Sequence, residues 1–479
     1  MQETNKLLKK KIISSLIWKF GERITAQIVS FIVSVVLARM LLPADYGVVA
    51  LVMVFITIAN VFVSNGFGSA LIQKKDADNL DFSSVFYINI AISLVLYTVL
   101  FFAAPYIASF YSMPVLSLVV RILGIRIIIA AVNSIQQAYV SREMLFKRFF
   151  WSTLSGTLFS GVLGIYMAYH GFGVWALVMQ YLTNTFVDTV VLWFTVRWRP
   201  MYKCSWKRAK ELIGFGWKIL VSALLDTIYS ELRNLLIGKI YSPDDLAVYN
   251  YGDKYPKLVV VNINNSISSV LFPAISMIQD DKERVKAMTR RAIRTSSYIM
   301  WPLMIGLGMV ADSLVKVILT DKWLPCVPYI RIFCFTYGLW PIHDSNLQAL
   351  KAMGRSDLFL KLEILKKIVG VVLLLTSINY GPFAIAQSLI IASIISVFIN
   401  SAPNRKILGY SYKEQFMDIF PPLMLSLLMA LIIYPVSYVN LPEVLVLIIQ
   451  IILGIIIYII GSVVTKQDSF IYLLTLLKK

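Results

Sequence analysis

Charged and polar side chains recur at helical spacing inside three otherwise apolar segments, residues 12–41, 211–240 and 246–278. Their spacing of mostly three or four residues places the members of each segment on one helical face. An ionised side chain at the centre of a lipid-facing helix costs about 2.5–3.5 kcal/mol, so such faces predict contact with protein or with a water-filled cavity. The three series are Lys19, Glu22, Arg23, Gln27, Ser30 and Ser34; Lys218, Ser222, Asp226, Tyr229 and Arg233; and Asn250, Asp253, Lys254, Lys257, Asn264 and Ser268.

Cations outnumber anions on these faces. The cations are Lys19, Arg23, Lys218, Arg233, Lys254 and Lys257, and the anions are Glu22, Asp226 and Asp253. Because a multiply charged anion needs cationic partners in a poorly solvated cavity, this balance favours an anionic cargo bound by the six cations. Gln27 and Asn264 are expected to add polar contacts together with the three anions. A second interpretation stays open, in which Lys19 and Glu22, or Asp253 and Lys257, form ion pairs that only join or stiffen helices.

Two further residues could take part in a mechanism. Pro256 lies between Lys254 and Lys257 and removes one helix hydrogen bond, so it is a candidate hinge, with a static kink as the alternative. Asp188 is a lone carboxylate in the middle of segment 173–196, where a proton or a sodium ion could bind.

Enzyme signatures are absent from the sequence. It has no Walker A loop, no H-E-x-x-H motif and no nucleophile elbow, and its three cysteines show no C-x-x-C spacing. Asp76-Ala77-Asp78 matches a D-x-D pattern, but in a ten-residue loop it indicates a solvated turn. We therefore expect no enzymatic activity, no metal site and no cofactor, with proton or sodium coupling left open.

The composition predicts an all-α, polytopic membrane protein. Of the 479 residues, 58% are hydrophobic and 15% charged, whereas soluble domains carry about 25% charge. Fourteen transmembrane helices of ~20 residues would leave connections too short for a soluble domain. The predicted spans are residues 12–41, 46–72, 83–107, 115–140, 148–168, 173–196, 211–240, 246–278, 292–317, 327–350, 358–378, 382–402, 416–437 and 442–464.

The placement of the charges predicts the orientation of these helices. Counting alternate connections and both termini, 30 Lys and Arg residues fall on one side, and only Lys322 falls on the other. By the positive-inside rule, both termini and the basic loops are cytoplasmic. The net charge of +19 is therefore explained by topology and contact with membrane lipid, and no nucleic-acid partner is expected.

Short patterns repeat in the same order about 200 residues apart, as in transporters built from internal repeats. Trp18-Lys19 matches Trp217-Lys218, and Gln137-Ala138 matches Gln348-Ala349. We predict two six-helix lobes followed by two further helices. The corresponding boundaries are residues 1–196 for the N-terminal lobe, 197–210 for a cytoplasmic linker, 211–402 for the C-terminal lobe, and 403–479 for the last two helices and the tail.

Two motifs resemble a known family. They are Leu41-Leu42-Pro43-Ala44-Asp45-Tyr46-Gly47 and Asn65-Gly66-Phe67-Gly68-Ser69-Ala70-Leu71-Ile72-Gln73. Both are similar to the polysaccharide transporter branch (Wzx, colanic-acid and teichuronic-acid exporters) of the multidrug/oligosaccharidyl-lipid/polysaccharide exporter superfamily. The resemblance extends over nearly the whole chain and implies the fold of these flippases.

The resemblance also implies a function. Members of this branch move an undecaprenyl-diphosphate-linked oligosaccharide, an O-antigen or exopolysaccharide repeat unit, across the bacterial cytoplasmic membrane by alternating access. An ion-coupled multidrug exporter of the same fold is the alternative. A monomer is expected, and a glycan polymerase and glycosyltransferases stay open as partners.

Overall fold

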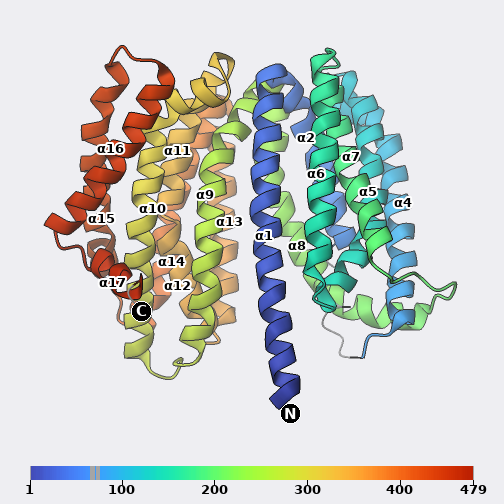
Figure 1. The fold of residues 1–479 in the computed structure, drawn as a ribbon, viewed down its shortest axis with the longest axis horizontal. Coiled ribbons are helices and arrows are strands. Elements are labelled where there is room, and N and C mark those ends of the chain that lie inside the picture. The colour runs from blue at the N-terminus through green and yellow to red at the C-terminus, as the bar shows by residue number, and fades with distance from the viewer. Residues whose placement is uncertain (1, 65–70, 72–75, 478–479) are drawn as a thin grey trace. The chain divides into compact units, whose positions relative to one another are not determined.

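The computed structural model describes residues 2–64, 71 and 76–477, without the side chains of residues 2–17, 19, 20, 23, 209, 211–213, 215, 218, 476 and 477. All regular secondary structure in these residues is helical (Figure 1). The prediction of an all-α protein is therefore confirmed. The motif 65–73 lies outside the described residues except for Leu71, which is fully buried.

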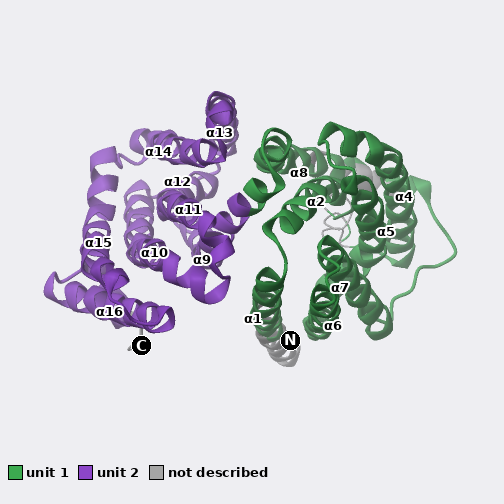
Figure 2. Ribbon diagram, turned by 90° about the horizontal axis from the view of Figure 1, so that it is seen from above, with its two compact units in different colours: residues 1–247 green, residues 248–479 purple. Residues whose placement is uncertain are grey.

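The chain divides into two compact units, Met1–Ala247 and Val248–Lys479 (Figure 2). The helices up to residue 240 are α1 (Gln2–Met40), α2 (Pro43–Ser64), α4 (Asn79–Phe110), α5 (Val115–Arg142), α6 (Phe146–Tyr169), α7 (Val174–Thr195) and α8 (Trp206–Ile240). The α-helices from residue 243 on are α9 (Pro243–Ser276), α10 (Lys282–Ile318), α11 (Val327–Gly338), α12 (Trp340–Ala352), α13 (Ser356–Ser377), α14 (Pro382–Ile407), α15 (Tyr412–Ile433), α16 (Glu443–Val464) and α17 (Asp468–Leu477). Short 3-10 helices cover Asp321–Cys326, Ile378–Tyr380 and Tyr434–Tyr438.

Each predicted span overlaps at least one of these helices. Eight of the described helices are long and apolar enough to cross a membrane: α2, α4, α5, α9, α10, α14, α16, and α15 extended to Tyr438. The chain is thus a multi-pass membrane protein, and the count of fourteen spans stays a prediction.

One predicted helix is interrupted. Segment 327–350 was expected to be continuous, but α11 ends at Gly338 and α12 begins at Trp340. Pro341 lies in the first turn of α12, where its nitrogen cannot donate to the carbonyl group of Tyr337. The local sequence therefore breaks the helix at Leu339, and the expectation of one continuous helix was wrong.

Helix packing differs between the units. In the first, α6 packs against α7 and α1, α5 packs against α4 and α7, and α2 packs against α5 and α8. In the second, α10 is central and contacts α11, α12, α15 and α16. Because α8 packs with α2 and α4, the compact unit includes it, whereas the repeat pattern starts the second lobe at residue 211. The repeat-based boundaries stay a prediction, since packing and internal repetition are different criteria.

The segment after α7 is attached to the first turns of α4. The indole nitrogen of Trp198 donates to Asn79 Oδ1 at 2.6 Å, and the backbone nitrogens of Met201 and Ser205 donate to Ser83 and Ser84 hydroxyls at 2.9 Å. Both serines are fully buried. The start of the predicted linker is therefore fixed to the first unit by hydrogen bonds rather than free.

The D-x-D turn also has a structural partner. Arg208 lies 2.5 Å from the Asp78 carboxylate and 3.7 Å from that of Asp81, and Asp78 and Asp81 form a capping box at the start of α4. The hydrogen bond from Arg208 lowers the pKa of Asp78 below its ordinary value. Asp78 thus caps a helix and anchors the linker.

This pair predicts a pH-dependent stability. The pKa of Asp78 is lower in the folded protein than in the unfolded chain, so the ionised carboxylate stabilises the fold. This stabilisation is complete above the pKa of the unfolded chain and is lost as the pH falls through the pKa of the folded protein. The side chains of Arg208 and Asp78 are 39% and 52% exposed, so we expect less than about 1 kcal/mol. Thermal unfolding of Arg208→Gln should differ most from wild type at about pH 7, and the difference should shrink as the pH falls below the ordinary carboxyl pKa of about 4. Lys207→Gln is the matched control and should behave as wild type at both pH values.

Gly47, in the first resemblance motif, permits a close backbone contact. A Cβ atom at this position would lie 1.9 Å from the carbonyl oxygen of Pro243. The Pro243 oxygen belongs to the backbone, and the added Cβ is fixed in direction by the backbone of residue 47, so no side-chain rotation can relieve the clash. We therefore expect Gly47→Ala to destabilise the first unit by at least about 1–3 kcal/mol. Gly214→Ala is the control, because no described atom beyond its chain neighbours and its own helix backbone lies within 4 Å of its added Cβ. Equal unfolding temperatures for both variants would contradict this account of the motif.

Candidate functional site

The charged stripe of α9 is partly self-paired. The Lys257 ammonium lies 3.2 Å from Asp253 Oδ2, one helical turn away, and the hydroxyl group of Tyr337 on α11 donates to Asp253 Oδ1. Both oxygens of this carboxylate therefore have partners. The Lys257 side chain remains 58% exposed, and that of Asp253 is 19% exposed. Asp253 and Lys257 thus form an ion pair within one helix, as the second interpretation of the sequence suggested.

Lys254 differs from its neighbour Lys257. Its ammonium lies 4.7 Å from the centre of the Tyr251 ring, and its side chain is half-buried. Among the described side chains, no carboxylate lies within ion-pair distance of it. A partly desolvated cation that contacts only an aromatic face can still accept an anionic ligand.

Arg233 on α8 has similar surroundings. Its guanidinium carbon lies 5.7 Å from the centre of the Tyr229 ring, one turn earlier, and its buried Nε lacks a hydrogen-bond acceptor in the described part of the chain. Asp226 on the same helix is exposed. Arg233 therefore also has donor capacity that the described protein groups do not use.

The remaining predicted residues are less completely described. Glu22 on α1 accepts a hydrogen bond from Thr153 on α6 at 3.3 Å, and Gln27 on α1 and Asn264 on α9 are half-buried. The side chains of Lys19, Arg23 and Lys218 lie outside the described residues. The structure thus brings together Asp253, Lys254 and Lys257 within the second unit, whereas Glu22, Gln27, Asp226 and Arg233 belong to the first. Their assembly into one cavity stays a prediction.

Pro256 lies within the continuous helix α9, which also contains Pro273. The side chain of Pro256 is buried. Its role as a hinge stays a prediction, because one conformation does not distinguish a hinge from a static kink.

Sequence reasoning missed the aromatic partners of this stripe. Tyr251 precedes Lys254 by three residues, so its position on the same helical face could have been recognised. Tyr337 is 84 residues from Asp253 in the sequence, and no local pattern predicts their contact.

The polysaccharide biosynthesis protein family matches residues 36–328, more than half of the chain. The chain belongs to this family. This confirms the resemblance recognised in the motifs at residues 41–47 and 65–73.

Named relatives of this polysaccharide biosynthesis protein align over most of its length. It is 26% identical over 444 residues to the teichuronic acid biosynthesis protein TuaB of Bacillus subtilis (strain 168), covering 90% of each chain. It is 23% identical over 414 residues to the succinoglycan biosynthesis transport protein ExoT of Rhizobium meliloti (strain 1021), covering 84% of this chain and 82% of that protein. Among solved structures, the inward closed conformation of the lipid II flippase MurJ aligns with a TM-score of 0.77 at 15% identity, covering 95% of this chain and 100% of that one. At this identity the likeness shows that the chain shares the fold of that structure.

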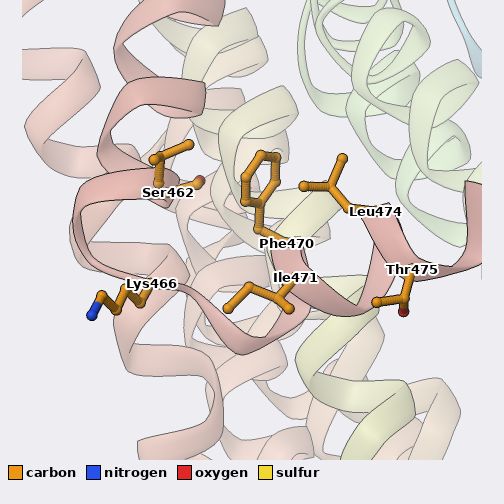
Figure 3. Close-up of a pocket in the computed structure, with 7 residues that line it drawn as sticks. Ser462, Lys466, Phe470, Ile471, Leu474 and Thr475 are labelled. Carbon is orange, nitrogen blue, oxygen red and sulfur yellow. The ribbon is translucent and has the colours of Figure 1, made fainter. Parts of the chain in front are cut away.

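A pocket in the second unit of this polysaccharide biosynthesis protein has no residue of the charged stripe of α9 in its lining. It has a volume of about 260 Å³ and lies between the end of α16 and α17 (Figure 3). Phe470 and Leu474 face this space, whereas the Lys466 side chain extends away from them (Figure 3). Its walls are mainly apolar, so the pocket is unsuited to binding a charged headgroup.

An ionic cluster that sequence reasoning missed joins α10 to α15. Asp418 has a fully buried side chain and accepts hydrogen bonds from Arg290 and Arg294, each at 2.6 Å, and from the Tyr410 hydroxyl at 2.8 Å. Arg294 also lies 3.5 Å from Asp468 on α17. In the sequence, Arg290 and Arg294 are only part of the basic charge that is predicted to be cytoplasmic, because their partner is more than 120 residues away. This cluster attaches the last helices to the rest of the second unit.

Proposed function

We propose that this family member is a flippase that moves an undecaprenyl-diphosphate-linked oligosaccharide from the cytoplasmic to the outer leaflet of the bacterial cytoplasmic membrane. The names of ExoT, a transport protein for succinoglycan biosynthesis, and of MurJ, a lipid II flippase, support this cargo class. In this proposal the protein is a transporter without catalytic activity, and its substrate is the lipid-linked glycan.

The availability of Lys254 is the observation that carries the proposal for an anionic cargo. Asp253 is already bound by Lys257 and Tyr337, so it does not neutralise Lys254. A diphosphate can supply the missing negative charge through hydrogen bonds from the ammonium group, and Arg233 can add a second cation. Lys19, Arg23 and Lys218 complete the proposed set of cations, with Lys257 at its exposed edge.

A multidrug exporter of the same fold is the second candidate. A cationic drug would need carboxylates that are free to pair with it, but Asp253 already has partners on both oxygens and Glu22 accepts a bond from Thr153. These contacts favour the anionic cargo.

The proposed topology has fourteen spans, with two six-helix lobes, two further helices and both termini in the cytoplasm. The lobes alternate between inward- and outward-open states around the polar headgroup, while the polyprenyl tail stays in lipid. Bending at Pro256 would couple headgroup contact at Lys254 to the angle between the lobes. A monomer suffices for this mechanism. Glycosyltransferases would act before the transport step, and a glycan polymerase would act after it.

Reconstituted transport tests the function directly. Purified protein in liposomes should move a fluorescent undecaprenyl-diphosphate oligosaccharide between leaflets, measured by quenching of the accessible pool. A cationic dye, tested in the same vesicles, should not be transported. Transport of the dye without the glycan would establish the multidrug alternative instead.

Disulfide cross-linking tests alternating access. One cysteine pair would join the cytoplasmic ends of the two lobes, and a second pair would join their external ends. Oxidation of either pair should block glycan movement, and reduction should restore it. Transport that continues with both ends locked would exclude rocking of the lobes.

A further inference from the structure

A buried polar contact joins α5 and α7 in the middle of the first unit. The side-chain amide of Asn133 donates to Asp188 Oδ2 at 2.6 Å. Ser152 on α6 and Gln137 on α5 lie beside the same carboxyl group. The helices approach closely here, because a Cβ atom at Gly156 would lie 2.9 Å from the carbonyl oxygen of Asn184 and 3.4 Å from Asp188 Cβ.

All identified neighbours of Asp188 are neutral. Among the described side chains, no Lys, Arg or His lies within ion-pair distance of its carboxyl group. The charged groups on the helices packed against α7 are Asp45 on α2, Arg121, Arg126 and Arg142 on α5, and Lys147 and Arg148 on α6. Arg126 is bound to Thr185, three residues before Asp188, at 2.8 Å. On α1, Glu22 accepts its bond from Thr153, next to Ser152.

Asn133 has an unused acceptor at this contact. Its side chain is 4% exposed, and its buried Oδ1 has no hydrogen-bond partner in the described structure. The observed contact uses the amide N–H of Asn133 and leaves its carbonyl oxygen without a donor. A buried acceptor without a partner is unfavourable. Because Oδ1 and Nδ2 belong to the same amide group, the free acceptor lies next to the carboxyl group.

Protonation of Asp188 would satisfy this acceptor. A carboxylic acid and a primary amide can form two hydrogen bonds at once, with the acid O–H donating to the amide oxygen and the amide N–H donating to the acid carbonyl. The ionised carboxylate can only accept. One proton taken from water would therefore add a hydrogen bond and remove an uncompensated charge from the interior of the unit.

We propose that Asp188 and Asn133 form a proton-binding site, in which the carboxyl group alternates between an ionised form, which only accepts hydrogen bonds, and a two-point acid–amide pair. The released proton returns to water, so the cycle needs no other reactant. Ser152 and Gln137 provide the neutral surroundings in which both forms can exist. The proposal concerns proton binding alone and does not depend on the identity of the cargo.

Infrared difference spectroscopy of the purified protein in liposomes tests this site. Between about pH 4 and pH 9, the wild-type protein should show the C=O band of a buried carboxylic acid, and Asp188→Asn should lose this band. Asp344→Asn is the matched control, because Asp344 on α12 is also held by neutral side chains, those of Ser268 and Gln348. It should retain the band. A spectrum of Asp188→Asn that keeps every carboxyl band of the wild type would overturn the proposal.

A second variant separates the acid–amide pair from an isolated carboxyl group. Asn133→Leu should keep the band but move it to higher frequency, because the acid loses its amide partner. An unchanged frequency would overturn the role of Asn133. If sodium chloride abolishes the band at constant pH while potassium chloride does not, sodium competes with the proton for this carboxyl group; if neither salt changes the band, the site binds the proton alone. Unchanged helical circular dichroism verifies that each variant is folded.

Discussion

Replacing Lys254 with alanine should reduce glycan transport by roughly ten- to a hundredfold while leaving the amount of protein in the membrane unchanged. The expected size follows from the loss of a charge-assisted hydrogen bond to the cargo, worth about 1.5–3 kcal/mol. Little stability should be lost, because the ammonium contacts a tyrosine ring and no carboxylate among the described residues. The measurement is the initial rate of leaflet transfer in liposomes containing equal amounts of protein.

Lys351→Ala is the matched control for this prediction. The Lys351 ammonium also lies over an aromatic ring, 4.3 Å from the centre of Phe359, but its side chain is exposed at the end of α12. Its replacement should leave transport within about twofold of wild type. Equal losses in the two variants would show that general surface charge, rather than the half-buried ammonium of Lys254, supports transport.

Replacing Asp418 with alanine should destabilise the second unit strongly. The change would leave Arg290 and Arg294 without the buried carboxylate that both contact at 2.6 Å, and it would remove the acceptor of the Tyr410 hydroxyl. Breaking a buried ionic contact by removing one partner costs about 3–5 kcal/mol. Both arginines are partly exposed, at 35% and 37%, so water reduces the cost towards the lower end of this range. The apparent unfolding temperature in detergent measures the effect.

Glu443→Gln provides the comparison for Asp418. Glu443 lies 2.6 Å from Lys316 on α10, but both side chains are about 40% exposed. An exposed ion pair contributes only about 0–1 kcal/mol, so this variant should unfold close to the wild-type temperature. If both variants lost equal stability, burial of Asp418 would not be the cause.

The sequence by itself determined the class of the protein and the positions of its helices. Apolar segments separated by charges predict helices because the bilayer core excludes unpaired backbone groups, and each segment overlaps an observed helix, although segment 327–350 is divided at Leu339. The motifs at residues 41–47 and 65–73 together were sufficient to recognise the family. Even the break at Leu339 has a local cause in Pro341, and the residue types alone could have revealed it.

Only the tertiary structure decided which charges have partners. Lys254 and Lys257 look equivalent in the sequence, but a hydrogen bond from Tyr337 on another helix helps to hold Asp253 beside Lys257. Lys254 has no carboxylate partner among the described side chains. Likewise, the partner of Arg290 is Asp418 on α15, 128 residues away in the sequence. The partner of Asp188 is Asn133 on α5, 55 residues away. Hydropathy and helical spacing report how one helix meets its surroundings, whereas the pairing of two charges depends on how different helices rotate and pack against each other. For that reason, the sequence located the polar faces and the structure assigned their partners.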